Sequence, residues 1–133
     1  MLASPASLVA VAIGGAAGSV ARYLLMTAVG QWLGTQFPYG TLMVNAIGCF
    51  AMGALAELAA LVWSPSPELR ALLMVGVLGG FTTFSSFTLD VGFLVSRNAI
   101  PAAAGYVLAS MVLTIAGFFA GLAVVRSLVS VPL

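Results

Sequence analysis

Four long apolar stretches, separated by short polar breaks, dominate the pattern of this chain. They cover residues 8–29, 39–62, 69–95 and 100–125. Each is long enough to cross a bilayer, because a membrane-spanning helix needs about 20 mostly apolar residues. The breaks are rich in Gly, Ser and Pro, as is typical of turns. The pattern predicts an all-α membrane protein in which residues 1–133 form a single domain of four transmembrane helices.

Composition supports the membrane assignment and excludes several classes of function. Hydrophobic residues make up 62% of the chain and charged residues 5%, whereas a soluble domain has about 25% charged residues. The absence of His and Lys leaves little for metal hydrolysis or general acid–base catalysis. A net charge of +1 provides no basic patch for nucleic acid. We expect a multi-pass protein of the cell inner membrane that contacts the lipid bilayer and is not an enzyme.

Two single residues bear on processing and redox chemistry. The first basic side chain, Arg22, lies deep in the first stretch, so this stretch is expected to remain as a helix and not to be a removable signal peptide. The lone cysteine, Cys49, excludes an intrachain disulfide and is expected to be a packing residue.

The four arginines divide evenly between the two sides of the predicted bundle. Side A, which carries the loop at 64–70, has Arg70 and Arg126, whereas the opposite side B has Arg22 and Arg97. Orientation normally follows an excess of positive charge in the cytoplasmic loops. Because neither side has an excess, insertion in both directions and an antiparallel, dual-topology homodimer are expected. A chance balance among so few charges is the alternative.

Small residues recur at helical spacing in three of the four stretches. Each GxxxG pair lets two helix backbones approach closely in lipid. Close packing within one chain explains most of them, but four helices seldom enclose a polar path alone, so some of these faces are expected to form the homodimer. The pairs are Gly14 with Gly18, Gly76 with Gly80, and Gly117 with Gly121.

The third stretch contains a poor helix-forming segment at residues 76–87, where glycines, threonines and serines interrupt the apolar run. This composition predicts a third helix that is broken near mid-membrane. Irregular backbone at that depth is tolerated only when it is buried in protein or lines a cavity. Freed carbonyls suit a hard cation, and freed amides or helix N-termini suit an anion. The break is therefore an ion-site hypothesis.

Two aromatic residues follow the break on one helix face. Phe84 and Phe87 stand at i and i+3. Phenylalanines in membrane helices commonly contact lipid or pack. The alternative is that the positive edges of their rings face a small anion.

Polar residues also line up on the second and fourth stretches. Tyr106, Ser110 and Thr114 stand at i, i+4 and i+8, and Thr41 with Asn45 at i and i+4. Hydroxyls in membrane helices often bond only their own i−4 carbonyl. Several in register favour a polar track, which suits a weakly held, partly desolvated ion.

Intramembrane carboxylates are scarce. Glu57 and Asp90 are the two candidates, and each lies nearer a helix end than its middle. Asp90 and Arg22 lie at a similar depth toward side B, so a pair between them is a hypothesis, either as part of the ion pathway or as a local salt bridge.

At these residues the chain resembles the Fluc (CrcB-type) fluoride channels, which are small four-helix proteins that work as antiparallel, dual-topology homodimers. Three segments carry the resemblance: 14–22, 38–48 and 79–87. It implies a fluoride-specific channel that passively exports fluoride and reduces its toxicity, with two pores per dimer. One departure is Asp90, which stands where the family commonly has glutamate.

The resemblance also implies roles for particular residues. It identifies Phe84 and Phe87 as fluoride-lining rings and Asn45 as the pore asparagine. Further residues of the implied ion pathway are Tyr106, Ser110, Thr114 and Arg22. The backbone carbonyls of Gly79 and Thr82 match positions that hold a structural sodium ion at the dimer interface.

Two other classes of protein share the size and helix number. A small multidrug-resistance transporter, coupled to protons, needs a carboxylate in the middle of its first helix, where this chain has Arg22 and no acid. A passive assembly subunit leaves the break and the hydroxyl stripe unexplained. Fluoride efflux from liposomes distinguishes the three.

Overall fold

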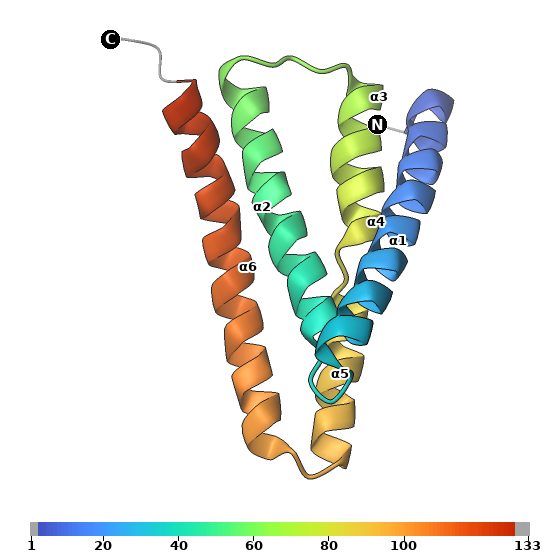
Figure 1. The fold of residues 1–133 in the computed structure, drawn as a ribbon. Helices are drawn as coiled ribbons and strands as arrows, with labels where there is room; N and C mark the ends of the chain where they lie inside the picture. Colours follow the sequence, from blue (N-terminus) through green and yellow to red (C-terminus); the bar gives the residue numbers. More distant parts are fainter. Residues whose placement is uncertain (1–2, 130–133) are drawn as a thin grey trace.

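A computed structural model describes residues 3–129 as an assembly of long helices (Figure 1). Four helical spans in this part of the chain are long and apolar enough to cross a membrane, as predicted, and their ends differ from the predicted ones by a few residues. The third span consists of several consecutive segments. The elements are α1 (Pro5–Leu33), α2 (Tyr39–Leu61), α3 (Pro67–Arg70), the π-helical segment η1 (Ala71–Leu78), α4 (Gly79–Phe81), α5 (Phe84–Ser96) and α6 (Ile100–Leu128).

The helices form two closely packed pairs. α1 packs along η1, and α2 packs along α6. The pairs spread apart toward side A, where the α2–α3 loop lies, so that the ribbon has the outline of a V (Figure 1). The lower half of the third span, α5, contacts α6 instead of α1. Because of the interruption, the first part of the third span packs against α1 and its last part packs against α6.

Glycines explain how closely the paired helices approach. A Cβ at Gly18 would overlap the Val77 carbonyl oxygen, and one at Gly121 would overlap that of Phe50. All three GxxxG pairs face another helix of the same chain in this way. The expectation that some of these faces form the homodimer is therefore wrong, because the α1–η1 and α2–α6 crossings already occupy them.

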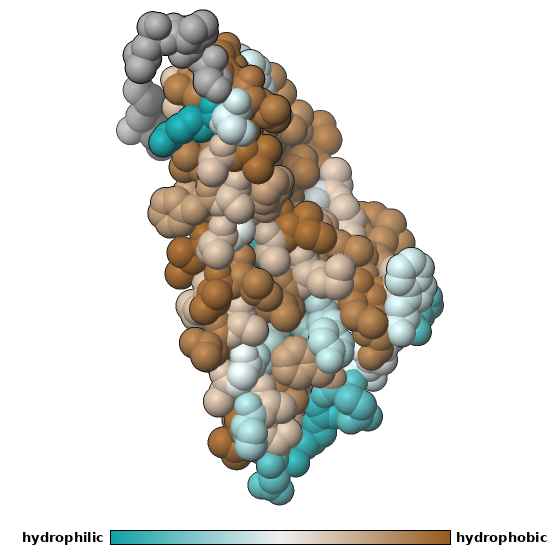
Figure 2. All heavy atoms as spheres, turned by 60° about the vertical axis from the view of Figure 1, so that its left-hand side comes forward, coloured by the Kyte–Doolittle hydropathy of each residue, from teal (hydrophilic) through white to brown (hydrophobic). Residues whose placement is uncertain are grey.

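Most of the helix surface is apolar and remains exposed in the single chain. Only 11% to 22% of the most apolar window of each span is buried. Figure 2 shows hydrophobic residues over most of the visible face, with hydrophilic ones gathered mainly at the side-B end. This distribution is that of a multi-pass membrane protein whose helices face lipid or another protein.

Candidate ion pathway

The break in the third span is confirmed and is two residues long. α4 ends at Phe81 and α5 begins at Phe84. Between them, Thr82 (φ −86°, ψ 155°) and Thr83 (φ −154°, ψ 118°) are extended. The Thr82 N–H still donates to the Leu78 carbonyl, but the Thr82 carbonyl and both backbone groups of Thr83 leave the helical hydrogen-bond ladder at a depth where lipid cannot replace the lost partners.

Asn45 on α2 supplies the partners for Thr83. Its Oδ1 accepts a hydrogen bond from the Thr83 N–H at 2.7 Å, and its Nδ2 donates to the Thr83 carbonyl at 2.9 Å. A carboxamide carries a donor and an acceptor in one plane, so it can bond the N–H and the carbonyl of one residue together. The Thr83 hydroxyl in turn caps α5 by accepting from the Ser86 N–H at 3.1 Å. Asn45 thus holds the break open in a fixed shape.

Other backbone groups at the break remain free. In the described part of the chain, the carbonyls of Gly79 and Thr82 accept no backbone hydrogen bond. Both residues line an open cavity of about 420 Å³. The other lining residues are Asn45, Cys49, Thr83, Phe84 and Thr114.

A smaller cavity of about 60 Å³ lies beside the first and brings most of the predicted pathway residues together. It shares Asn45, Phe84 and Thr114 with the larger one and adds Phe87, Ser110 and Met111. Ser110 is 6% exposed, and its Oγ lies near the Tyr106 hydroxyl without meeting the geometry of a hydrogen bond. Ser110 thus lines this cavity with a hydroxyl that is itself buried.

The two predicted phenylalanines occupy different environments. Their ring centroids are 5.3 Å apart at an interplanar angle of 41°. Phe87 is 8% exposed and packs against Tyr106, whereas Phe84 is 71% exposed on the surface of the single chain. Phe87 forms an inner wall of the cavity, and Phe84 lies at its open side.

The hypothesis of a pair between Asp90 and Arg22 is wrong for this chain. Asp90 accepts a hydrogen bond at 3.0 Å from the Tyr106 hydroxyl, because α5 lies against α6 and not against α1. Among the described residues the salt bridge is between Arg126 Nε and Glu57 Oε1, at 2.7 Å. Arg22 lines none of the cavities near the break.

The hydroxyl track is only partly continuous. Thr114 donates to the carbonyl of Ser110 at 2.6 Å, which is the local i−4 bond considered above. Tyr106 is fully buried, and Asp90 with Thr41 lines a separate cavity of about 180 Å³ toward side B. The track therefore runs from the break through Ser110 and Tyr106 toward that second cavity.

Sequence reasoning assigned no site role to three residues of these two cavities. Cys49, expected to pack, and Thr83 line the larger cavity, and Met111 lines the smaller one. Cys49 follows Asn45 by four residues, a spacing that places both on one helix face. That spacing could have identified Cys49 as a cavity residue, whereas nothing in the sequence pattern pointed to Met111.

Four membrane-capable helices, a break at mid-span and small polar-lined cavities beside it define a small multi-pass membrane protein with features of an ion path. A sequence profile of the CrcB-like protein family, also described as Camphor Resistance (CrcB), matches residues 9–122. The chain therefore belongs to the CrcB-like family, and the resemblance noted in its sequence is confirmed.

Similar proteins carry a more specific name. The fluoride-specific ion channel FluC of Rhodospirillum centenum is 62% identical over 123 residues, which cover 92% of this chain and 98% of that protein. FluC of Chelativorans sp. is 53% identical over 121 residues (91% and 97%). FluC of Nitrobacter winogradskyi is 46% identical over 119 residues (90% and 94%).

Proposed function

We propose that this protein is a fluoride-specific ion channel of the cell inner membrane that passively exports fluoride and reduces its toxicity. The names of its relatives support this function. The observation that carries it is a cavity of about 60 Å³ in which Asn45, Ser110 and two phenylalanine rings come together. A cavity of this size holds a particle about as large as water.

The lining suits a small anion that must also leave. Ser110 offers a hydroxyl donor, and ring edges offer a weak positive potential without a fixed charge. Asn45 has two N–H groups on Nδ2, and one is used by Thr83. Asn45 thus positions the break and keeps one donor for the ion. Tyr106 and Thr114 extend the proposed pathway.

The working form is an antiparallel homodimer with two pores. Phe84 and the cavity beside Gly79 are open on the surface of the single chain, and a second copy would cover them. The even division of arginines supports opposite orientations. Extra lysines in the loop at 64–70 should force one orientation and abolish transport, and an oppositely biased partner should restore it. Full activity of a single-orientation population contradicts this arrangement.

A structural sodium ion at the dimer interface fits the free carbonyls of Gly79 and Thr82, since such oxygens are ligands of hard cations. One chain offers two of them, and a two-fold axis would double the set. The bound ion would hold the two breaks together and supply fixed positive charge near the pores. Removal of sodium from purified protein should shift the population from dimer to monomer.

The direct test is fluoride efflux from liposomes that contain only the purified protein. Fast, proton-independent fluoride efflux with little chloride efflux is expected. A strict requirement for a proton gradient favours the small multidrug-resistance alternative. An absence of any ion flux favours a passive assembly subunit.

A further inference from the structure

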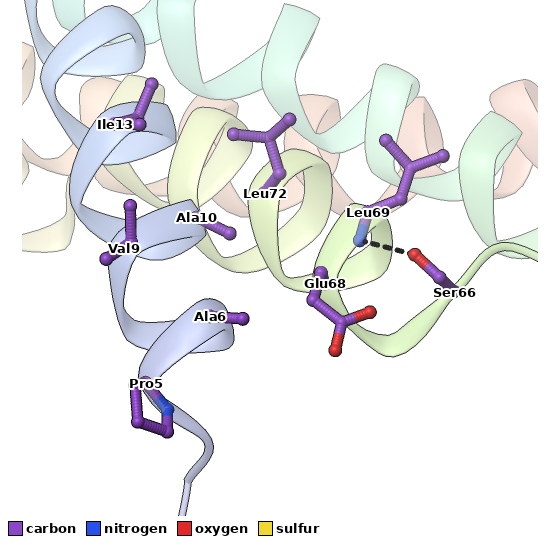
Figure 3. Close-up of a pocket in the computed structure, with 9 residues that line it drawn as sticks. All are labelled: Pro5, Ala6, Val9, Ala10, Ile13, Ser66, Glu68, Leu69 and Leu72. Carbon is purple, nitrogen blue, oxygen red and sulfur yellow. Dashed lines mark hydrogen bonds between the residues drawn. The ribbon is translucent and has the colours of Figure 1, made fainter.

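A large groove of the molecule lies away from the ion pathway. A groove of about 700 Å³ runs between the start of α1 and the α3–η1 segment (Figure 3). Its walls are almost entirely apolar, and it shares no residue with the cavities around the break. Side chains that line it include Ala6, Val9, Ala10 and Ile13 of α1, with Leu69 and Leu72 opposite.

The position of the groove matches one leaflet of a bilayer. Pro5 and Glu68 lie in the first turns of their spans, at the side-A boundary. Ile13 is the deepest lining residue of α1, and the rise from Pro5 to Ile13 along a helix is about 12 Å. Half of a hydrocarbon core of about 30 Å is about 15 Å. Because its walls cannot bond water, a groove at this depth is filled by an acyl chain.

The charge at the mouth of the groove selects the headgroup. Glu68 is half-buried there and forms no hydrogen bond or ion pair among the described residues (Figure 3). Arg70 stands two residues on, so it points to another face of the helix. The Ser66 hydroxyl already accepts from the Leu69 N–H at 3.2 Å. The charge that borders the groove is therefore acidic and favours a cationic donor.

We propose that this groove binds one acyl chain of a phospholipid whose primary ammonium headgroup donates hydrogen bonds to the carboxylate of Glu68. Phosphatidylethanolamine has this chemistry. Phosphatidylglycerol has no cation, and phosphatidylcholine has a cation without an N–H donor. The site is independent of the ion pathway, so its test does not depend on fluoride transport.

The experiment uses native mass spectrometry of the purified full-length protein with the three dioleoyl lipids added separately. The parent should retain phosphatidylethanolamine about three- to fivefold better than phosphatidylglycerol, as expected for one partly exposed ionic contact. Glu68→Gln should remove this preference but keep acyl-chain binding. Ala10→Phe fills the groove and should lower binding of all three lipids.

Ala12→Phe is the matched control, because Ala12 is exposed two residues along α1 and does not line the groove. If Ala10→Phe does not fold, Ala6→Leu fills the same groove with less bulk. Equal retention of the three lipids by the parent, or unchanged binding in the groove-filling variants, overturns the proposal. So does loss of the homodimer in Ala10→Phe but not in Ala12→Phe, since a second copy would then cover the groove.

Discussion

The α1–η1 crossing and the break in the third span both hold helices together, but through different interactions. At the crossing, every helix keeps its own backbone hydrogen bonds, and glycines such as Gly18 only remove bulk so that the helices can touch. At the break, the backbone of Thr83 has left its helix and depends on Asn45 from α2. The first region is held by shape and the second by two specific hydrogen bonds.

The largest effect is expected where those bonds are removed. Asn45→Leu leaves the N–H and the carbonyl of Thr83 unsatisfied, which should cost about 2–6 kcal/mol of stability at about 1–3 kcal/mol per group. Fluoride efflux should be lost with the shape of the break. Thermal unfolding in detergent and liposome efflux measure the two effects.

Asn45→Asp sharpens this result. It keeps an acceptor for the Thr83 N–H but loses the donor to its carbonyl and adds a negative charge. Its stability should fall between those of the parent and Asn45→Leu, and it should still block an anion. Parental efflux in both variants would show that the ion does not pass the break.

The stability of the helix crossings should depend only on the side-chain volume at the glycine positions. Gly121→Ala places a Cβ against the Phe50 carbonyl and should cost about 1–3 kcal/mol, as overpacking does. Gly105→Ala on the same helix meets no atom within 4 Å, so it should be neutral or slightly stabilising. Unfolding temperatures of the two variants compare the positions directly, and equal values would contradict the close α2–α6 approach.

Substitutions of the two phenylalanines distinguish an effect on packing from an effect on conduction. Phe87→Ile should cost up to about 1.5 kcal/mol, because the ring is buried against Tyr106. Phe84→Ile should change the stability of the single chain less, because that ring is 71% exposed. Both lose a ring edge, so fluoride efflux should fall in both while the protein stays folded. Parental efflux in both folded variants would place the pore elsewhere.

The smallest effect on stability is expected at Ser110. Its Oγ lies near the Tyr106 hydroxyl without meeting the geometry of a hydrogen bond, so Ser110→Ala should leave stability unchanged or slightly raised. Fluoride efflux should nevertheless fall by about tenfold, the equivalent of a lost contact of about 1.4 kcal/mol. Thr88→Val is the matched control, since its hydroxyl is bonded to the Phe84 carbonyl and it lines none of these cavities. An equal loss in both variants would argue against a special role for Ser110.

The sequence by itself determined the class of fold and the location of the break. Insertion into a membrane depends on the length and hydropathy of each stretch, and helix interruption depends on local composition, so both are visible in a linear pattern. Local spacing also placed Phe84 and Phe87 on one face of the third helix, and both line one cavity.

Only the tertiary structure decided which side chains meet across helices. Asp90 bonds Tyr106 and not Arg22, because the lower half of the third span lies against α6. The glycine pairs are used inside the chain, because α1 packs on η1 and α2 on α6. Asn45 bonds both backbone groups of Thr83 because α2 lies next to the break. A periodic pattern specifies the faces of each helix, whereas the partner of a face depends on which helices become neighbours.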